Sequence, residues 1–230
     1  MTSDIICHNR GGLVARTLRD LTETQLKEGF EFDATRGKYE ADLEAWGQAW
    51  HIRDGVQIKV NRILFAGAPN NGTVVAQPTH LKKYLEILMT ATNLLPEFVD
   101  VTVDAVLTVA KLLLSEVVPE LPGLDDQKPK SKLLKLLKKV PDPQDAAIEA
   151  DYEPPAGLQA IMRTADLAMD FVFGQERNDL VVPTTGVSQW PGGSFQQVRR
   201  LPFSADRSVQ NSSLFLQEEA RRQLWEWLTA

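Results

Sequence analysis

The segment IICHNRGGLVAR, residues 5–16, joins a short apolar run, a polar turn and the beginning of a helical pattern. A sharp strand-to-helix turn of this kind can present a nucleophile above a sheet, where a base and an acid assist it in cleaving an ester. The residue at the apex of the turn is Asn9. Its amide nitrogen shares its lone pair with the carbonyl group, so Asn9 is not expected to attack a substrate.

Three neighbours of Asn9 could contribute other groups. The backbone N–H of Arg10 is a candidate donor to an oxyanion. Cys7 belongs to a more reactive residue type than serine, but two positions before the apex it should lie in the strand, buried and inert. For His8 we favour a structural role, because a residue next to the apex points away from it.

An acid and a base would have to come from later in the chain. Asp179, in the loop NDLVVPT at 178–184, is the candidate acid, although an acid in a loop can also serve only to cap a turn. The chain contains three histidines, His8, His51 and His80. None of them follows Asp179, so the sequence offers no obvious base beyond that loop.

The turn at Asn9 resembles the HSRGGLVAR-type nucleophile elbow of lipase-like α/β-hydrolases, with Cys7 replacing the first glycine and Asn9 the serine. Three more segments follow in the order that this family shows: FAGAPNNGT at 65–73, NDLVVPT at 178–184, and ADRSVQNSSLF before the last helix. The resemblance spans nearly the whole chain. It implies an α/β-hydrolase of the lipase or esterase type, with Asp179 as the triad acid.

The same resemblance places the triad histidine after Asp179, because the order in this family is serine, acid, histidine. Gln210 and Asn211 stand in that place, and Asn211 fits better because an apolar pair follows it at the right distance. Neither side chain can carry a proton in the neutral range. The resemblance therefore implies a degenerate triad, in which a serine at position 9 would not by itself restore turnover.

The elements that must position these residues alternate along the chain. Strands are expected near residues 5, 60, 148 and 199, and helical patterns lie between and after them. This alternation predicts an α/β fold with a mostly parallel sheet of about four strands, flanked by helices. A length of 230 residues suits one domain, so residues 1–230 are treated as a single unit.

Residues 79–140 have a helical pattern with a broad apolar face. Under the resemblance they are a helical lid inserted into a partial α/β-hydrolase fold, and they cover a site for an apolar or acyl small molecule. Plain core packing predicts the same periodicity. Within this region, residues 127–139 hold four leucines and six lysines. One interpretation is a basic helix that contacts an acidic partner or a membrane surface. We favour the other, in which the lysines form the solvated face of a packed helix.

Composition excludes several classes of protein. A net charge of −6 argues against a general nucleic-acid binder, and hydrophobic residues at 43% argue for a folded chain. Charged residues interrupt the most apolar stretch, 98–118, so no membrane span is expected. A single cysteine cannot form an internal disulfide, which favours a cytoplasmic location. No cofactor or metal site is expected.

The strand near residue 5 would normally pair with strands that precede the elbow in this family. Left unpaired, its apolar edge at Ile5 and Ile6 invites a second polypeptide or a second copy of the chain. The alternative is that the sequence is part of a longer protein. Taken together, the residues predict a non-catalytic binding or assembly module. An active carboxylic ester hydrolase whose serine is replaced by Asn9, and a purely structural subunit, remain as alternatives.

Overall fold

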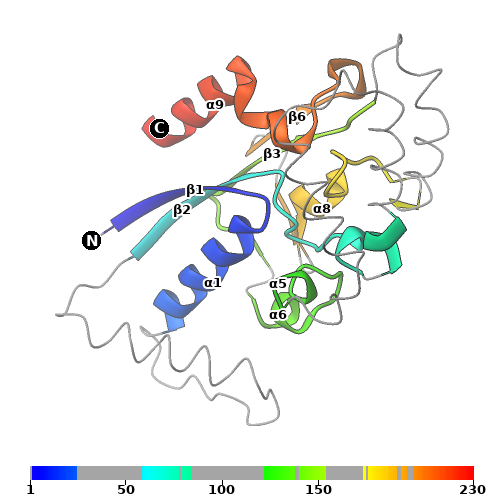
Figure 1. The fold of residues 1–230 in the computed structure, drawn as a ribbon. Coiled ribbons are helices and arrows are strands. Elements are labelled where there is room, and N and C mark those ends of the chain that lie inside the picture. Colours follow the sequence, from blue (N-terminus) through cyan, green and yellow to red (C-terminus); the bar gives the residue numbers. More distant parts are fainter. Residues whose placement is uncertain are drawn as a thin grey trace.

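A parallel sheet of four strands forms the centre of the molecule (Figure 1). The computed structural model describes residues 2–24, 59–77, 79–83, 122–137, 140–153, 173–174, 176–190, 193–195 and 199–230. The strand order follows the chain, and all three pairings are parallel. The expected α/β fold with about four strands is confirmed. The strands are β1 (Thr2–His8), β2 (Lys59–Ala66), β3 (Ala146–Ala150) and β6 (Arg200–Phe203).

Helices cover both faces of this sheet. In Figure 1, α9 (Glu218–Thr229) lies on one side of the strands, and α1 (Gly11–Thr24) lies on the other. A short helix, α8 (Thr184–Ser188), packs against β3 and leads into a two-stranded hairpin. The remaining described elements are α5 (Pro122–Asp125), α6 (Lys132–Leu136), β4 (Gln189–Trp190), β5 (Gly193–Ser194) and the 3-10 helices η2 (Val74–Ala76), η5 (Ala205–Arg207) and η6 (Asn211–Leu216).

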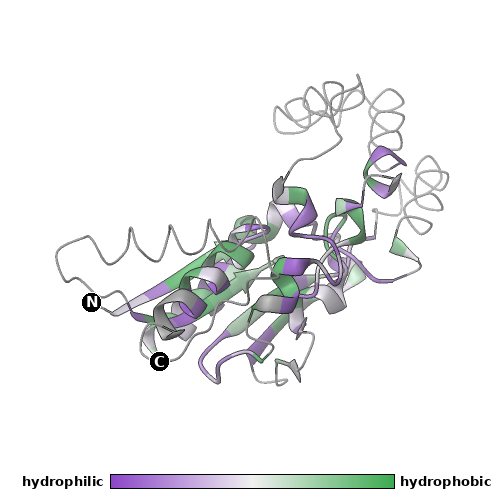
Figure 2. Ribbon diagram, turned by 90° about the horizontal axis from the view of Figure 1, so that it is seen from below, coloured by the Kyte–Doolittle hydropathy of each residue, from purple (hydrophilic) through white to green (hydrophobic). Residues whose placement is uncertain are grey.

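The apolar run of β2 explains why the sheet is covered on both faces. Ile63 and Phe65 belong to the cluster on the side of α1 and α8, whereas Leu64 and Ala66 belong to the cluster under α9. Successive side chains of a strand point to opposite faces, so a continuous apolar run requires a cover on each side. The hydropathy colouring in Figure 2 shows this apolar character along the strands.

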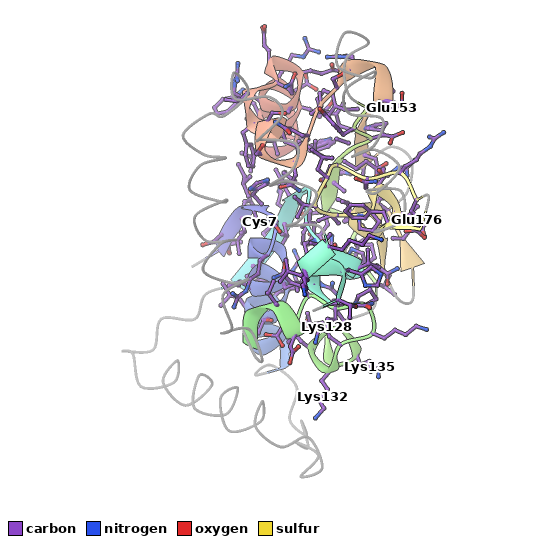
Figure 3. The ribbon with its side chains drawn as sticks, turned by 45° about the vertical axis from the view of Figure 1, so that its right-hand side comes forward. Cys7, Lys128, Lys132, Lys135, Glu153 and Glu176 are labelled. Carbon is purple, nitrogen blue, oxygen red and sulfur yellow. The ribbon has the colours of Figure 1, made fainter. Side chains whose placement is uncertain are left out.

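The lysine-rich segment packs as a solvated helix. Leu134 and Leu137 are buried against Leu13 of α1, while Lys132 and Lys135 are exposed. Figure 3 shows Lys132 projecting away from the body of the molecule. For the described helix Lys132–Leu136, the packed-helix interpretation agrees with the enclosure of Leu134 and the exposure of Lys132 and Lys135.

Two expectations need a different description. The last strand was expected over 194–203, but the structure limits it to β6, and Gly193–Ser194 pairs instead with β4. The loop after Asp179 contains the helix α8, which is too short to leave a periodic signal.

Most of the expected lid, residues 84–121, lies outside the described residues, and so does the helical pattern at 157–172. Within the described part of the chain, no helix is long and apolar enough to cross a bilayer.

Candidate functional site

Asn9 lies at the apex between β1 and α1. Its φ angle is 51°, in the left-handed region that non-glycine residues seldom adopt, although asparagine tolerates it better than most. The backbone N–H of Asn9 donates to the Ala66 carbonyl at 3.1 Å, which ties the turn to the end of β2. The structure therefore places residues 7–11 at a sharp strand-to-helix turn between β1 and α1.

Gly12 allows the helix to approach the sheet at this point. A Cβ atom at position 12 would lie 2.5 Å from the Cβ of Ala68 and 3.2 Å from the Phe65 ring. No side chain fits in that space, so glycine at position 12 has a packing reason. The result is a tight strand-to-helix turn that holds Asn9 above the sheet.

Cys7 and His8 take the places that the sequence suggests for them. Cys7 is buried, its thiol donates to the Leu64 carbonyl at 3.5 Å, and burial raises its pKa. A thiol held in the protonated form is a poor nucleophile. The His8 Nε2 atom donates to the Asn211 carbonyl at 3.0 Å, and the ring lies edge-on to Phe215 at 5.4 Å between centroids. His8 thus anchors the elbow to the loop at Asn211.

Arg10 points away from the sheet. Its side chain is exposed and lies against Gly123 in α5, where a Cβ atom would be only 2.0 Å from a guanidinium nitrogen. Within the described part of the chain, the Arg10 N–H makes no backbone hydrogen bond. It is thus compatible with the expected role as an oxyanion donor.

Asp179 is fully buried, with an exposed fraction of 0%. Its Oδ1 atom accepts from the N–H groups of Val181 and Val182 at 3.0 and 2.7 Å, and its Oδ2 atom accepts from the Asn211 amide at 2.7 Å. The first two bonds cap the turn in which Asp179 lies. The third reaches a segment more than thirty residues further along. Asp179 therefore both caps its own turn and contacts Asn211.

The surroundings of Asp179 stabilise its negative charge only weakly. Burial raises the pKa of its carboxyl group to about 6, while the hydrogen bonds from Val182, Asn211 and Val181 act to lower it. All of these donors are neutral groups. A carboxylate that has lost its hydration without gaining a cation remains easier to protonate than one in water.

Asn211 uses both hydrogens of its amide. One Nδ2–H is directed to Asp179 at 2.7 Å, and the same nitrogen also donates to the Gly67 carbonyl at 3.1 Å. Its own N–H donates to the Asp179 carbonyl at 2.9 Å. The side chain is 3% exposed, so no water competes for these bonds. Asn211 is locked in place, with no amide proton left to direct at Asn9.

Gly67, which the sequence analysis did not single out, makes this contact feasible. Its φ angle is 53°, and a Cβ atom there would lie 2.4 Å from the Asn211 amide nitrogen and 3.0 Å from the Asp179 Oδ2. Glycine is the residue that accepts both the left-handed backbone and the close approach. The available signal was a glycine directly after a predicted buried strand.

Three chain segments meet at one edge of the sheet. Asn9 follows β1, Gly67 follows β2, and Asn211 lies in the segment after β6. Because these strands are parallel, their carboxyl ends share an edge, which is where α/β proteins place ligands. The structure brings Asp179 and Asn211 into direct contact, and it links Asn9 to them through Ala66, Gly67 and His8. No metal-binding group of three or more His, Cys, Asp or Glu side chains occurs among the described residues.

A second buried polar cluster, at the other end of the sheet, was also missed. Arg19 of α1 makes two bonds to Asp145, at 2.6 and 2.7 Å, and one to Asp142 at 2.8 Å. Arg16 lies over the Trp190 ring at 4.0 Å, and burial lowers its pKa to about 10. Arginines three positions apart on an otherwise apolar helix face were the signal available in the sequence.

Comparison with known proteins identifies the family. Residues 47–229 match the family described as "Domain of unknown function (DUF7379)", and the chain belongs to it. The match includes Asp179 and Asn211 and begins after α1, so the turn at Asn9 precedes the matched range. A search of curated proteins gave no match.

Proposed function

We propose that this protein is a catalytically inactive α/β-hydrolase-like protein of the lipase or esterase type, which acts as a binding or assembly module. The observation that carries the proposal is the hydrogen bonding of Asn211. Both hydrogens of its amide go to acceptors, one to Asp179 and one to Gly67. In a working triad, an imidazole at this place would accept a proton from the nucleophile.

The position of Asn9 supports the same conclusion. A left-handed residue between β1 and α1 is the backbone arrangement of a nucleophile elbow, but the side chain offers an amide in place of a hydroxyl group. The elbow and the acid therefore persist as geometry, while both groups that would handle the proton are amides. Cys7 cannot substitute, because its thiol is buried and its pKa is raised.

The ligand class follows from the lipase-like resemblance. We propose an apolar or acyl small molecule held near Asn9 and Asp179, under the apolar segment at 79–140. We also propose a cytoplasmic location, which the single buried thiol supports. The free edge of β1 is proposed as the place where another polypeptide joins the sheet.

Ester hydrolysis tests the loss of catalysis. We expect the wild-type protein and Asn9→Ser to leave a short p-nitrophenyl ester uncleaved, because neither has a base at position 211. The double variant Asn9→Ser/Asn211→His restores nucleophile and base, and any turnover that it gains should disappear when Asp179→Asn is added. Hydrolysis by the wild-type protein that depends on Asp179 would refute the proposal and identify an active esterase.

Ligand binding tests the positive half of the proposal. A fluorescent fatty-acid analogue should bind the wild-type protein in a saturable manner, without turnover, and a bulky substitution at the apex, Asn9→Trp, should weaken that binding. The matched control is Val14→Trp, an exposed position on α1. If no acyl ligand binds and a protein copurifies instead, the chain is a structural subunit.

A further inference from the structure

The two edges of the described sheet differ in how well they are protected. At one edge, β6 has four residues and contains Arg200 and Pro202, which discourage pairing with another strand. At the other edge, β1 has seven residues and contains no proline, lysine or arginine. Within the described part of the chain, only β2 pairs with β1. A long edge strand without such protection is a template for another strand.

One face of β1 is also uncovered. Ile5 and Cys7 join the apolar cluster on the side of α1, whereas no β1 residue joins the cluster under α9. The intervening Ile6 points to that second face and is 45% exposed. A half-exposed isoleucine at the centre of an unprotected edge is the kind of surface that association buries.

The backbone groups that face outward can be identified. The Asn9 N–H points to β2, where it donates to Ala66. Since the N–H and C=O groups of successive residues alternate between the two edges of a strand, those of Asp4, Ile6 and His8 point away from β2. These three residues would exchange hydrogen bonds with an added strand.

We propose that the added strand is β1 of a second copy of this chain, paired antiparallel about a twofold axis at Ile6. This deepens the assembly role in the proposed function. In this register Ile6 lies opposite Ile6 of the second copy, and Asp4 lies opposite His8 in both halves of the pair. The two exposed isoleucines bury one another, and the Asp4 carboxylate, which pairs with Arg62 of its own chain, has no second acid opposite it.

Other registers are less complementary. A twofold axis at Ile5 would set the Asp4 carboxylate against the apolar side chain of Ile6. An axis at Asp4 would place two like charges opposite each other, which destabilises a strand pair. An axis at Cys7 would leave only Ile6, Cys7 and His8 paired within β1, because Ile5 would then face Asn9. The Ile6 register pairs Asp4 to His8 within the strand and joins the two sheets into one of eight strands.

Light scattering after size-exclusion chromatography tests the association. We expect a molar mass twice the 25.7 kDa of the chain, and we expect Ile6→Lys to raise the dissociation constant about tenfold or more, because two lysines would meet at the axis. The matched control is Val14→Lys, which adds the same charge at an exposed apolar position of α1 and should leave the dimer intact. Circular dichroism verifies that both variants fold.

Cross-linking tests the register. In a Cys7→Ala background, which removes the only native cysteine, Ile6→Cys should form a covalent dimer. Directly opposite residues of a hydrogen-bonded antiparallel pair lie about 5.5 Å apart between Cα atoms, within disulfide range. Mixing Asp4→Cys with His8→Cys should give a mixed dimer, whereas Val14→Cys should give none.

Three results would overturn the inference: a wild-type protein that stays monomeric up to about 100 μM, a dimer that Ile6→Lys leaves intact, or association only with a different polypeptide. None of these affects the ester assay, so the inference and the loss of catalysis can fail separately.

Discussion

Two fully buried aspartates, Asp145 and Asp179, lie at opposite ends of the sheet in opposite surroundings. Asp145 precedes β3 and is held by two bonds from the Arg19 guanidinium and one from the Ile63 N–H at 2.7 Å. Asp179 lies beyond the carboxyl ends of the strands, and its donors among the described residues are neutral. In this part of the chain, one acid has a cation to balance its charge, and the other is held by amides.

This difference separates an acid that ties two elements together from an acid whose charge the described surroundings do not balance. A buried carboxylate paired in a bidentate manner with arginine ties a helix to the sheet. A buried carboxylate without a cation is unfavourable for folding, as its raised pKa shows. Such an arrangement is typical of positions shaped for function.

The largest effect is expected at the paired acid. Arg19→Leu would leave Asp145 buried without its cation, so the free energy of unfolding should fall by about 3–5 kcal/mol. Urea denaturation measures this loss. The control Arg222→Leu breaks an exposed pair with Glu226 and should cost less than about 1 kcal/mol. If both variants lose the same free energy of unfolding, the buried pair contributes no more to stability than the exposed one.

Asp179 should make the protein less stable as the pH rises. A carboxylate that stabilises the fold in its ionised form has the opposite effect. The native pKa of Asp179 is raised from 3.8 to about 6, so the native state binds more protons than the unfolded chain between these values. Stability contributed by this group is therefore lost as pH rises through that window, by about 3 kcal/mol in total. Above about pH 6, Asp179 is ionised in the native state, and the full cost of burying its charge lowers the stability of the fold.

The variant Asp179→Asn removes this titration. The wild-type protein should lose stability relative to the variant between about pH 4 and pH 6, as denaturation at several pH values would show. A wild-type curve that rises with pH relative to the variant would mean that the neutral donors outweigh burial.

A smaller effect should follow from crowding the contact between Asp179 and Asn211. Gly67→Ala adds a Cβ atom 2.4 Å from the Asn211 amide to a residue with a φ angle of 53°, and should cost about 2–3 kcal/mol. The matched control is Gly174→Ala, where φ is 64° but no atom lies within 4 Å. This control should cost only about 1 kcal/mol, for the backbone alone. Thermal unfolding measures the stability that each variant loses. The difference between the two losses is the cost of crowding the contact between Asp179 and Asn211, and equal losses would show that crowding has no effect.

The smallest effect concerns the strain at the apex. Asn9→Gly relaxes the left-handed residue, whereas Asn9→Ala retains the strain without the tolerance of asparagine. The two variants should differ by about 1 kcal/mol in the free energy of unfolding, in favour of glycine. A difference of zero would indicate that the turn relaxes when the side chain is removed.

Much of the fold could be predicted from residue patterns. The strands near 5, 60 and 148 were expected because apolar runs of strand length bounded by turn residues form buried strands in an alternating α/β chain. The elbow at Asn9 and the acid at Asp179 were expected from local motifs. Helix α8 and the hairpin after it were missed, since five- and two-residue elements are too short to show a period.

The amino-acid sequence by itself determined that an amide stands at position 9 and that no histidine follows Asp179, because these are properties of residue types. It also determined the alternation of strands and helices, since hydrophobic periodicity is local. Only the tertiary structure decided that Asn211, and not Gln210, contacts Asp179, that Gly67 makes room for the contact, and that Arg19 balances Asp145. Those contacts join residues far apart in the chain, and they exist only once parallel strands bring their ends together.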